Sequence, residues 1–270
     1  MTPNLKVTQK PGRGRVVHVT PQNAGWTYVG HDHYRLASGQ SASGGSADRE
    51  TCLVFIQGKG KVSAGGDLGE LGGRTSPFEG KPWSVYIPAG TDWSVTATTE
   101  LELSVCTAPA TENKLPVRVI SPDELSTTTR GKGSNTRYVT NILAETDPAD
   151  SLLVVEVITP GGNTSSYPPH RHDEDDLPRQ SLLEETYYHR INPPQGFAFQ
   201  RVYTDKGADG SRELDVAMSI EDGDVTLVPK GYHPCAACHG YDLYYLNVMA
   251  GPVRTWKFHN APEHEWLMKG

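Results

Sequence analysis

Three histidines and two glutamates in the second half of the chain have the types and spacing of a metal site. His170 and His172 form an HxH in the segment SYPPHRHDEDD, and His233 follows later in VPKGYHPC. Glu184 and Glu185 lie between them. In a β-strand, residues i and i+2 point to the same face, so an HxH directs two imidazoles at one point. With a third imidazole and a carboxylate, the site would suit zinc, iron, manganese, cobalt or nickel and leave positions open for a substrate.

Only one of the two glutamates can face the histidines, because neighbouring residues on a strand point to opposite faces. We predict that Glu185 is the ligand, since it precedes Thr-Tyr-Tyr as Glu50 in the first half precedes Thr-Cys-Leu. Glu184 is the alternative. The expected ligand set is therefore His170, His172, Glu185 and His233.

The rest of this strand follows from the same alternation. With Glu185 inward, Tyr187 and His189 also face inward, and Tyr188 and Arg190 face outward. Tyr187 lies about 7 Å along the strand from Glu185 and His189 about 13 Å. Either side chain could contact a substrate or pack inside the fold.

Composition favours an all-β protein. The chain has 270 residues, of which 28 are Gly and 20 are Pro, and 36% are hydrophobic, which is typical of many short strands and turns. A formal charge of −7 argues against nucleic acid as a partner. The N-terminus has no apolar signal segment, and no run approaches the ~20 apolar residues that span a bilayer. We therefore expect a cytoplasmic protein without a membrane partner.

The two halves share one pattern. A proline–glycine turn followed by a polar residue occurs as IPAGTD at residues 87–92 and as VPKGYH at residues 228–233. We interpret this as a degenerate duplication of an all-β unit, with domains over residues 1–115 and 116–270. The duplication is unequal, because Asp92 stands where the second half has His233. We therefore expect a metal site in the second unit only.

Three other segments invite a functional interpretation. His31 and His33 form a second HxH, but it precedes the glycine turn, and we expect two partly exposed imidazoles. The segment Leu36–Asp48 is low in complexity and is expected to be a flexible loop. Cys235-Ala-Ala-Cys238-His matches a c-type haem attachment pattern, but no export signal supports it. We expect two half-buried thiols beside a turn, and their role stays open.

The arrangement G…HxH…E…G followed by P-x-G-x-H resembles the cupin superfamily. A longer run, PPHRHDEDDLPRQSLLEETYYHRINPPQGFAFQRVY, closely resembles the 5-deoxy-glucuronate isomerases of bacterial myo-inositol catabolism. So do GDVTLVPKGYHP, GYDLYYLNVMAGP and HNAPEHEW. The likeness covers nearly all of the second half and, more weakly, the first. The segment DEDDLPRQSLLE, which is inserted relative to a typical cupin motif, is expected to form a loop at the barrel mouth.

This resemblance implies a bicupin of two tandem barrels that converts 5-deoxy-D-glucuronate to 5-dehydro-2-deoxy-D-gluconate. It implies a divalent metal, with zinc as the first choice and manganese, iron, cobalt or nickel as alternatives, and a metal-assisted enediol mechanism. The partner is a small sugar acid, and a homodimer or higher homo-oligomer is expected. Two rival functions use the same fold: a metal-dependent cupin dioxygenase and a sugar-binding bicupin without catalysis.

The chemistry of a sugar acid suggests further site residues. Tyr187, His189 and Asp176, the last of these in an acidic run, are candidates for moving the proton. A carboxylate substrate calls for an arginine, since a guanidinium binds it through two hydrogen bonds. The candidates for substrate binding are Arg179, Arg190, Arg201, Tyr203 and Tyr244.

Overall fold

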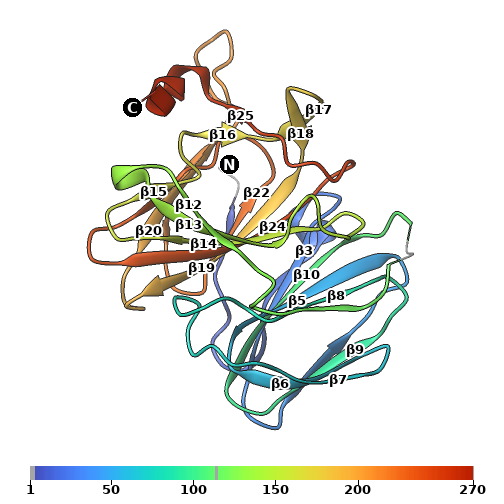
Figure 1. The fold of residues 1–270 in the computed structure, drawn as a ribbon. Coiled ribbons are helices and arrows are strands. Elements are labelled where there is room, and N and C mark those ends of the chain that lie inside the picture. Colours follow the sequence, from blue (N-terminus) through green and yellow to red (C-terminus); the bar gives the residue numbers. More distant parts are fainter. Residues whose placement is uncertain (1–3, 113–114, 270) are drawn as a thin grey trace.

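The computed structural model describes residues 4–112 and 115–269. In these ranges the regular secondary structure is almost entirely β-strand, and the strands form two barrels packed against each other (Figure 1). The predicted all-β class is confirmed. The described helices are all short: α1 (Pro21–Ala24), η1 (Gly133–Asn135) and η2 (Pro262–Lys269). None of the helices in these ranges is long and apolar enough to cross a membrane.

The first barrel combines a large and a small antiparallel sheet. In spatial order, the large sheet contains β11 (Arg118–Ile120), β8 (Ser84–Ile87), β5 (Arg49–Gln57), β10 (Leu101–Pro109), β3 (Gly30–Leu36) and β2 (Gly14–Val19). The small sheet contains β4 (Ser41–Gly44), β9 (Trp93–Ala97), β6 (Lys59–Ala64) and β7 (Asp67–Gly72).

The second barrel repeats this plan and adds two small strand pairs. Its large sheet contains β1 (Lys6–Val7), β22 (Val225–Val228), β19 (Glu184–Asn192), β24 (Asp242–Ala250), β14 (Leu153–Thr159), β13 (Arg137–Leu143) and β12 (Thr127–Arg130). Its small sheet contains β15 (Thr164–Ser165), β23 (Cys235–Ala237), β20 (Ala198–Tyr203) and β21 (Asp215–Ile220). The added pairs are β16 (His170–Arg171) with β25 (His259–Asn260), and β17 (Asp173–Asp176) with β18 (Gln180–Leu182). Both pairs lie at one end of this barrel, at the top of Figure 1.

The large sheets are apolar on both faces because each separates two hydrophobic cores. On β5, Leu53 and Phe55 point into the first barrel, and Val54 points toward the second. Val54 belongs to a core that also contains Leu246 and Val248 of β24. Each fully buried aliphatic side chain stabilises the fold by roughly 1.5–3 kcal/mol. The two barrels therefore share a continuous apolar core.

Two strands cross between the barrels. β1 comes from the start of the chain but pairs with β22 of the second barrel. β11 begins at Arg118 but pairs with β8 of the first barrel. The predicted boundary between residues 115 and 116 stays a prediction. Each of these two strands lies on one side of it in the sequence and pairs with a strand that lies on the other side. Such an exchange leaves no trace in a local sequence pattern.

Two local expectations were wrong. The segment Leu36–Asp48 is not only a loop, because it contains β4, which pairs with β9. His31 and His33 are 1% and 0% exposed, not partly exposed, because β3 lies in the large sheet that faces the second barrel. Their rings bond there to Ser104 and to side chains of β19.

Candidate metal centre

The HxH, Glu185 and His233 reach one end of the second barrel from three separate strand regions. His170 lies on β16, and His172 follows it directly. Glu185 lies on β19, which pairs with β22 so that Glu185 stands opposite Val228. The turn after β22 carries His233. In this turn Gly231 has a φ of 87°, and a Cβ at this position would lie 2.4 Å from the Tyr203 carbonyl oxygen. A glycine there lets the chain turn tightly and bring His233 back over the barrel.

Three of these side chains converge on one point. The Nε2 atoms of His172 and His233 lie 3.2 and 3.3 Å from the Glu185 Oε2. The ligand atoms of the three residues all lie within 4.8 Å of one another. All three side chains are buried, and none of these three atoms has a hydrogen-bond partner. Unpartnered buried lone pairs are costly, and a divalent cation at their centre would satisfy all of them at once.

The second nitrogen of each imidazole is held by the backbone. Nδ1 of His172 lies 3.0 Å from the Leu183 carbonyl oxygen, and Nδ1 of His233 lies 2.9 Å from that of Gly231. A carbonyl only accepts, so Nδ1 carries the proton and the Nε2 lone pair points to the centre. Histidine ligands of metals are usually oriented in this way. The two rings are thus fixed in the tautomer that binds a cation.

His170 occupies a looser position. Its ring centre lies 5.0 Å from that of His233 and 6.4 Å from that of His172, and the ring packs on Phe258. Nδ1 lies 3.2 Å from the Pro168 carbonyl oxygen. His170 is thus oriented like the other two imidazoles, but it lies outside their tight group.

Charge and burial favour a cation at this point. Burial lowers the pKa of His170 and of His233 to about 3, so both imidazoles are neutral near pH 7. Burial alone would lower the pKa of His172, but the adjacent Glu185 carboxylate raises it above its ordinary value. The carboxylate therefore attracts positive charge to the position that the neutral imidazoles face.

Glu184 points the other way. Its carboxylate accepts the backbone N–H groups of Thr27, Tyr28 and Val29 at 2.6, 2.6 and 3.0 Å. It thus binds the segment that leads into β3 of the first barrel. Of the two glutamates, only Glu185 faces the histidines, as strand alternation predicts.

Comparison with known proteins identifies the family. The model of the KduI/IolB family matches residues 4–267. The chain belongs to the KduI/IolB family. A 5-deoxy-glucuronate isomerase of Geobacillus kaustophilus is 54% identical over 258 residues, which cover 95% of this chain and 91% of the relative. The predicted family and the isomerase class are confirmed.

Solved structures give the same result for the fold. The crystal structure of an IolB-like protein from Salmonella typhimurium LT2 has a TM-score of 0.94 and 51% identity, and covers 98% of this chain and 100% of that one. An oxalate decarboxylase of Bacillus subtilis, described with Mn(II) centres, has a TM-score of 0.62 at 14% identity and covers 96% of this chain and 80% of that one. The predicted bicupin fold is confirmed.

Tyr187 and His189 of β19 face the interior of the barrel, as strand alternation predicts. Tyr187 lines the same cavity as His172 and Glu185, and its hydroxyl lies 2.9 Å from the Ser166 hydroxyl. His189 stacks against Tyr187 one step further into the barrel, at 5.8 Å between ring centres. Burial lowers the pKa of His189 to about 3, so this imidazole is neutral.

The predicted arginines are occupied elsewhere. Arg179 lies on the exposed β17–β18 hairpin and pairs with Asp176 and Glu174 at 2.5 Å each. Asp176, expected to move a proton, is therefore also held outside the cavity. Arg201 is exposed and pairs with Asp215 through two hydrogen bonds of 2.8 and 2.7 Å. The expected inserted loop is this hairpin, in which Arg179 pairs with two of the acidic side chains.

Three other predicted substrate residues face away from the cavity. Arg190 points to the first barrel and pairs with Glu102 and Asp222. The Tyr244 hydroxyl donates to Glu156 at 3.1 Å in the core between the barrels. Tyr203 packs against Tyr232 in a small separate cluster. Strand alternation explains the orientation of Arg190 and Tyr244, because the even-numbered residues of β19 and β24 face the first barrel.

Sequence reasoning missed several side chains that line the cavity with the histidines. They come from β12, β13, the β15 region, β24 and the C-terminal segment. These residues are Arg130, Arg137, Ser166, Tyr245, Asn247 and Trp256. The segment TTTRGKGSNTRYV contains a usable signal, because its glycine-rich turn predicts a hairpin that brings its two arginines together.

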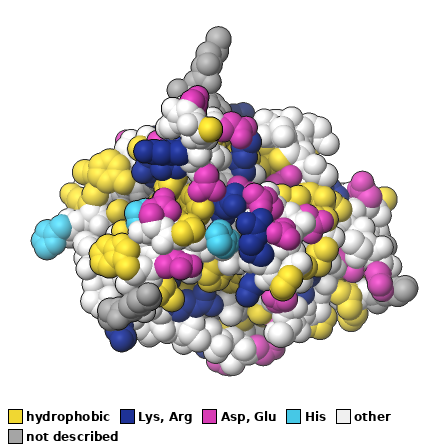
Figure 2. Space-filling model, turned by 90° about the horizontal axis from the view of Figure 1, so that it is seen from above, with side chains coloured by type: hydrophobic (Ala, Val, Ile, Leu, Met, Phe, Trp, Pro, Cys, Tyr) yellow, Lys and Arg dark blue, Asp and Glu magenta, His cyan; other side chains and the backbone are white. Residues whose placement is uncertain are grey.

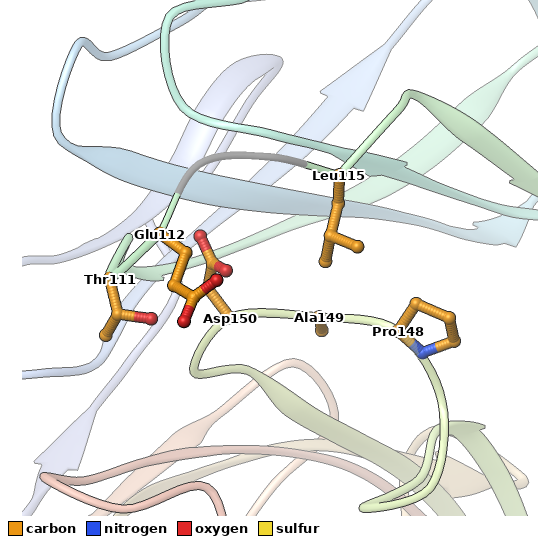
Figure 3. Close-up of a pocket in the computed structure, with 6 residues that line it drawn as sticks. All are labelled: Thr111, Glu112, Leu115, Pro148, Ala149 and Asp150. Carbon is orange, nitrogen blue, oxygen red and sulfur yellow. The ribbon is translucent and has the colours of Figure 1, made fainter.

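The surface around the site is mixed in charge. Figure 2 views the molecule from the end that carries β16 and β17, and acidic, basic and histidine side chains intermix there beside hydrophobic ones. A separate hollow lies where the connection between the barrels passes the loop before β14, with Leu115 and Pro148 at its rim (Figure 3). Its described lining contains no imidazole, so it lacks the donors of the metal centre.

Among its described residues, the first barrel lacks the corresponding ligands. Thr51 stands opposite Ile87 as Glu185 stands opposite Val228, so the residue equivalent to Glu185 is Thr51. The equivalence that we expected between Glu50 and Glu185 was off by one residue. The cysteines add no second site among the described residues: Cys235 is buried in β23, Cys238 is half-buried, and both are free thiols.

Proposed function

We propose that this chain isomerises 5-deoxy-D-glucuronate to 5-dehydro-2-deoxy-D-gluconate by a metal-assisted route in the myo-inositol catabolism of the cytoplasm. One observation carries the proposal. The unpartnered Nε2 atoms of His172 and His233 and Oε2 of Glu185 converge on one point, and His172 and Glu185 line a cavity there. Relatives that are about half identical over nearly the whole chain bear the name of this isomerase.

His172, Glu185 and His233 would hold the cation, and His170 would approach as a fourth ligand. Imidazole nitrogens with one carboxylate oxygen suit zinc first, with manganese, iron, cobalt or nickel as alternatives. When bound, the cation would stabilise negative charge on the carbonyl oxygen of the sugar as a Lewis acid. Such preorganised charge in a site shielded from water lowers a barrier by several kcal/mol.

Tyr187 is the residue that we assign to the reacting oxygens. Its hydroxyl lines the cavity and is oriented by the Ser166 hydroxyl at 2.9 Å. Isomerisation transfers a proton between C1 and C2 through an enediol, and both oxygens change their protonation. A neutral phenol held beside them can donate to the oxygen that becomes negative, which typically contributes about 10²–10⁴ in rate.

His189 would act through Tyr187 and not on the substrate. It lies behind the Tyr187 ring, and its Nε2 is 3.2 Å from both the Gln200 Oε1 and the Thr226 hydroxyl. These contacts fix the imidazole as a rigid support. Its assignment thus changes from a proton carrier to a positioning residue.

The proposal is tested with the purified, metal-loaded protein and 5-deoxy-D-glucuronate. Ketose formation is followed by NMR in deuterated water, since proton transfer through an enediol introduces solvent deuterium at C1. Parallel samples are treated with a chelator and then reloaded with zinc or manganese. We expect turnover that disappears on chelation and returns with metal.

Two results would contradict the proposal and identify the rival. Oxygen uptake during turnover would indicate a dioxygenase, because isomerisation consumes no oxygen. Unchanged substrate with a full complement of metal would indicate a binding protein without catalysis. We further propose a homodimer or higher homo-oligomer, which light scattering after size exclusion tests; a monomer at micromolar concentration would exclude it.

A further inference from the structure

Two arginines that line the cavity stand directly opposite each other. Arg130 ends β12 and Arg137 begins β13, and the two residues are paired in the register of this antiparallel hairpin. Side chains at directly opposite positions lie about 5 Å apart at Cβ, and like charges there are destabilising. The hairpin therefore concentrates positive charge on one wall of the cavity.

Neither arginine has a carboxylate partner among residues 4–112 and 115–269. The Arg137 Nη1 donates to the Asn135 carbonyl oxygen at 3.0 Å, and the Arg130 guanidinium lies 5.6 Å from the centre of the Trp256 ring. The predicted candidates differ, because Arg179, Arg190 and Arg201 all pair with acidic side chains. Unlike these three arginines, Arg130 and Arg137 can pair with an anionic ligand.

Two further N–H donors in the cavity also lack a hydrogen-bond partner. The Trp256 Nε1 and the Asn247 Nδ2 are buried, line the cavity and have no hydrogen-bond partner. The unpartnered atoms of His172 and Glu185, which also line the cavity, carry lone pairs, as does that of the adjacent His233. The cavity thus offers both unpartnered N–H donors and cation ligands.

Electrostatics agree with this division. Burial lowers the pKa of Arg137, and the neighbouring Arg130 charge lowers it further. Both arginines line the same cavity as His170 and His172, which places them near the histidines. An anion between the guanidiniums would relieve their repulsion.

We infer that Arg130 and Arg137 form the carboxylate-binding subsite of this enzyme and select short sugar acids over neutral sugars. The inference rests on the proposed function. The substrate carboxylate binds between the two guanidiniums, with Trp256 and Asn247 as further donors, and the chain of the sugar spans to the histidines. A neutral sugar leaves the half-buried guanidiniums unpaired, which is costly, so the pair acts as a specificity filter.

The experiment compares an acidic and a neutral substrate. We measure kcat/KM for 5-deoxy-D-glucuronate and for 5-deoxy-glucose, which carries a hydroxymethyl group in place of the carboxylate. The variants are Arg130→Met, Arg137→Met and Arg137→Lys. Arg118→Met is the matched control, because Arg118 also lies over an aromatic ring, that of Tyr86 in the first barrel.

We expect Arg137→Met to lower kcat/KM for the acid by about 10- to 100-fold and to leave that for the neutral sugar within about threefold. Arg130→Met should act in the same direction, and Arg137→Lys should lie between, since it keeps the charge but loses the planar fork. Arg118→Met should match the wild type. If the variants still prefer the acid as strongly as the wild type does, the inference is wrong.

A binding measurement separates this inference from the proposed reaction. The C1-reduced alditol of the substrate keeps the carboxylate but cannot isomerise, and its binding is followed by the shift in melting temperature. Stabilisation of the wild type but not of Arg137→Met supports the subsite even if no turnover occurs. Equal stabilisation of both proteins overturns the subsite even if the enzyme is an isomerase.

Discussion

Glu50 and Glu184 perform the same task in opposite directions across the two barrels. Glu50 on β5 accepts the backbone N–H groups of Asp150, Ser151 and Leu152 at 2.8, 2.6 and 2.6 Å, just before β14 of the second barrel. Glu184 on β19 binds the segment before β3 of the first barrel in the same way. The duplicated units are thus joined by two reciprocal carboxylate–backbone clamps. Since Glu184 serves this role, its neighbour Glu185 is free to face the histidines.

Exchanging carboxylate for amide at these adjacent positions should give opposite phenotypes. We expect Glu184→Gln to lower the free energy of unfolding by about 3 kcal/mol, because an amide cannot accept all of the buried N–H groups that the carboxylate binds. We expect Glu185→Gln to lose the bound metal while the barrels stay folded. Urea denaturation and metal analysis by mass spectrometry measure the two effects.

Glu50→Gln is the matched control for this pair. It should lose a similar free energy of unfolding to Glu184→Gln, because the clamps are equivalent, and should retain metal. Loss of metal from Glu184→Gln with unchanged stability would show that the ligand and the clamp had been exchanged.

The sequence predicted what depends on local periodicity and short motifs. Alternation along β19 places Tyr187 and Tyr188 on opposite faces, as the structure does, and the HxH and the turn before His233 mark where His172, Glu185 and His233 converge. Prediction from the sequence failed where the structure depends on pairing between strands that are distant in the chain. The equivalence of Glu50 with Glu184 follows from the register of two strand pairs, β5 with β8 and β19 with β22. No local sequence pattern contains that register.

The arginines failed for a related reason. Composition and motif cannot say whether an arginine already has an acidic partner, and that partner decides whether it can bind a ligand. Arg201, a predicted candidate, has Asp215 on the neighbouring strand, whereas Arg137, which the sequence did not single out, has another arginine opposite it.

The imidazoles should differ in their importance for metal binding. We expect His172→Ala and His233→Ala to lose metal and activity, because each supplies one of the converging atoms. His170→Ala should bind metal more weakly but measurably, since His170 lies outside the tight group. Metal titration of the apoproteins measures the order. Circular dichroism should show folded barrels throughout, because the core of the second barrel is formed by apolar side chains. Full metal content in His172→Ala or His233→Ala would remove that residue from the ligand set.

Glu102 should make stability depend on pH in the acid range. Burial alone would raise the pKa of this carboxyl, but His33 and the Arg190 and Arg35 guanidiniums lower it from 4.5 to about 2. A depressed pKa means that the folded state binds the proton more weakly than the unfolded chain does. The contribution is therefore complete above about pH 4.5 and is lost as the pH falls toward about 2.

The variant Glu102→Gln isolates this effect from the other carboxyls. We expect it to be less stable than the wild type at pH 7, by up to about 3 kcal/mol. The difference should shrink as urea denaturation is repeated at successively lower pH between 4.5 and 3. A difference that stays constant over this range would show that Glu102 stabilises the interface by packing and not by charge.

Tyr187 and Tyr188 offer a test of the proposed chemistry within one dipeptide, because they lie on opposite faces of β19. The Tyr187 hydroxyl faces the cavity, and the Tyr188 hydroxyl bonds to His33 at 3.0 Å in the core between the barrels. We expect Tyr187→Phe to lower kcat by about 100-fold with KM, metal content and melting temperature nearly unchanged, since it removes one donor to the reacting oxygens. Tyr188→Phe should instead lower stability by about 1 kcal/mol and keep kcat, because its lost hydrogen bond is structural. Steady-state kinetics and thermal unfolding on both variants decide the matter. Equal kcat in the two variants would reduce Tyr187 to a packing residue and leave the proton transfer to another group in the cavity.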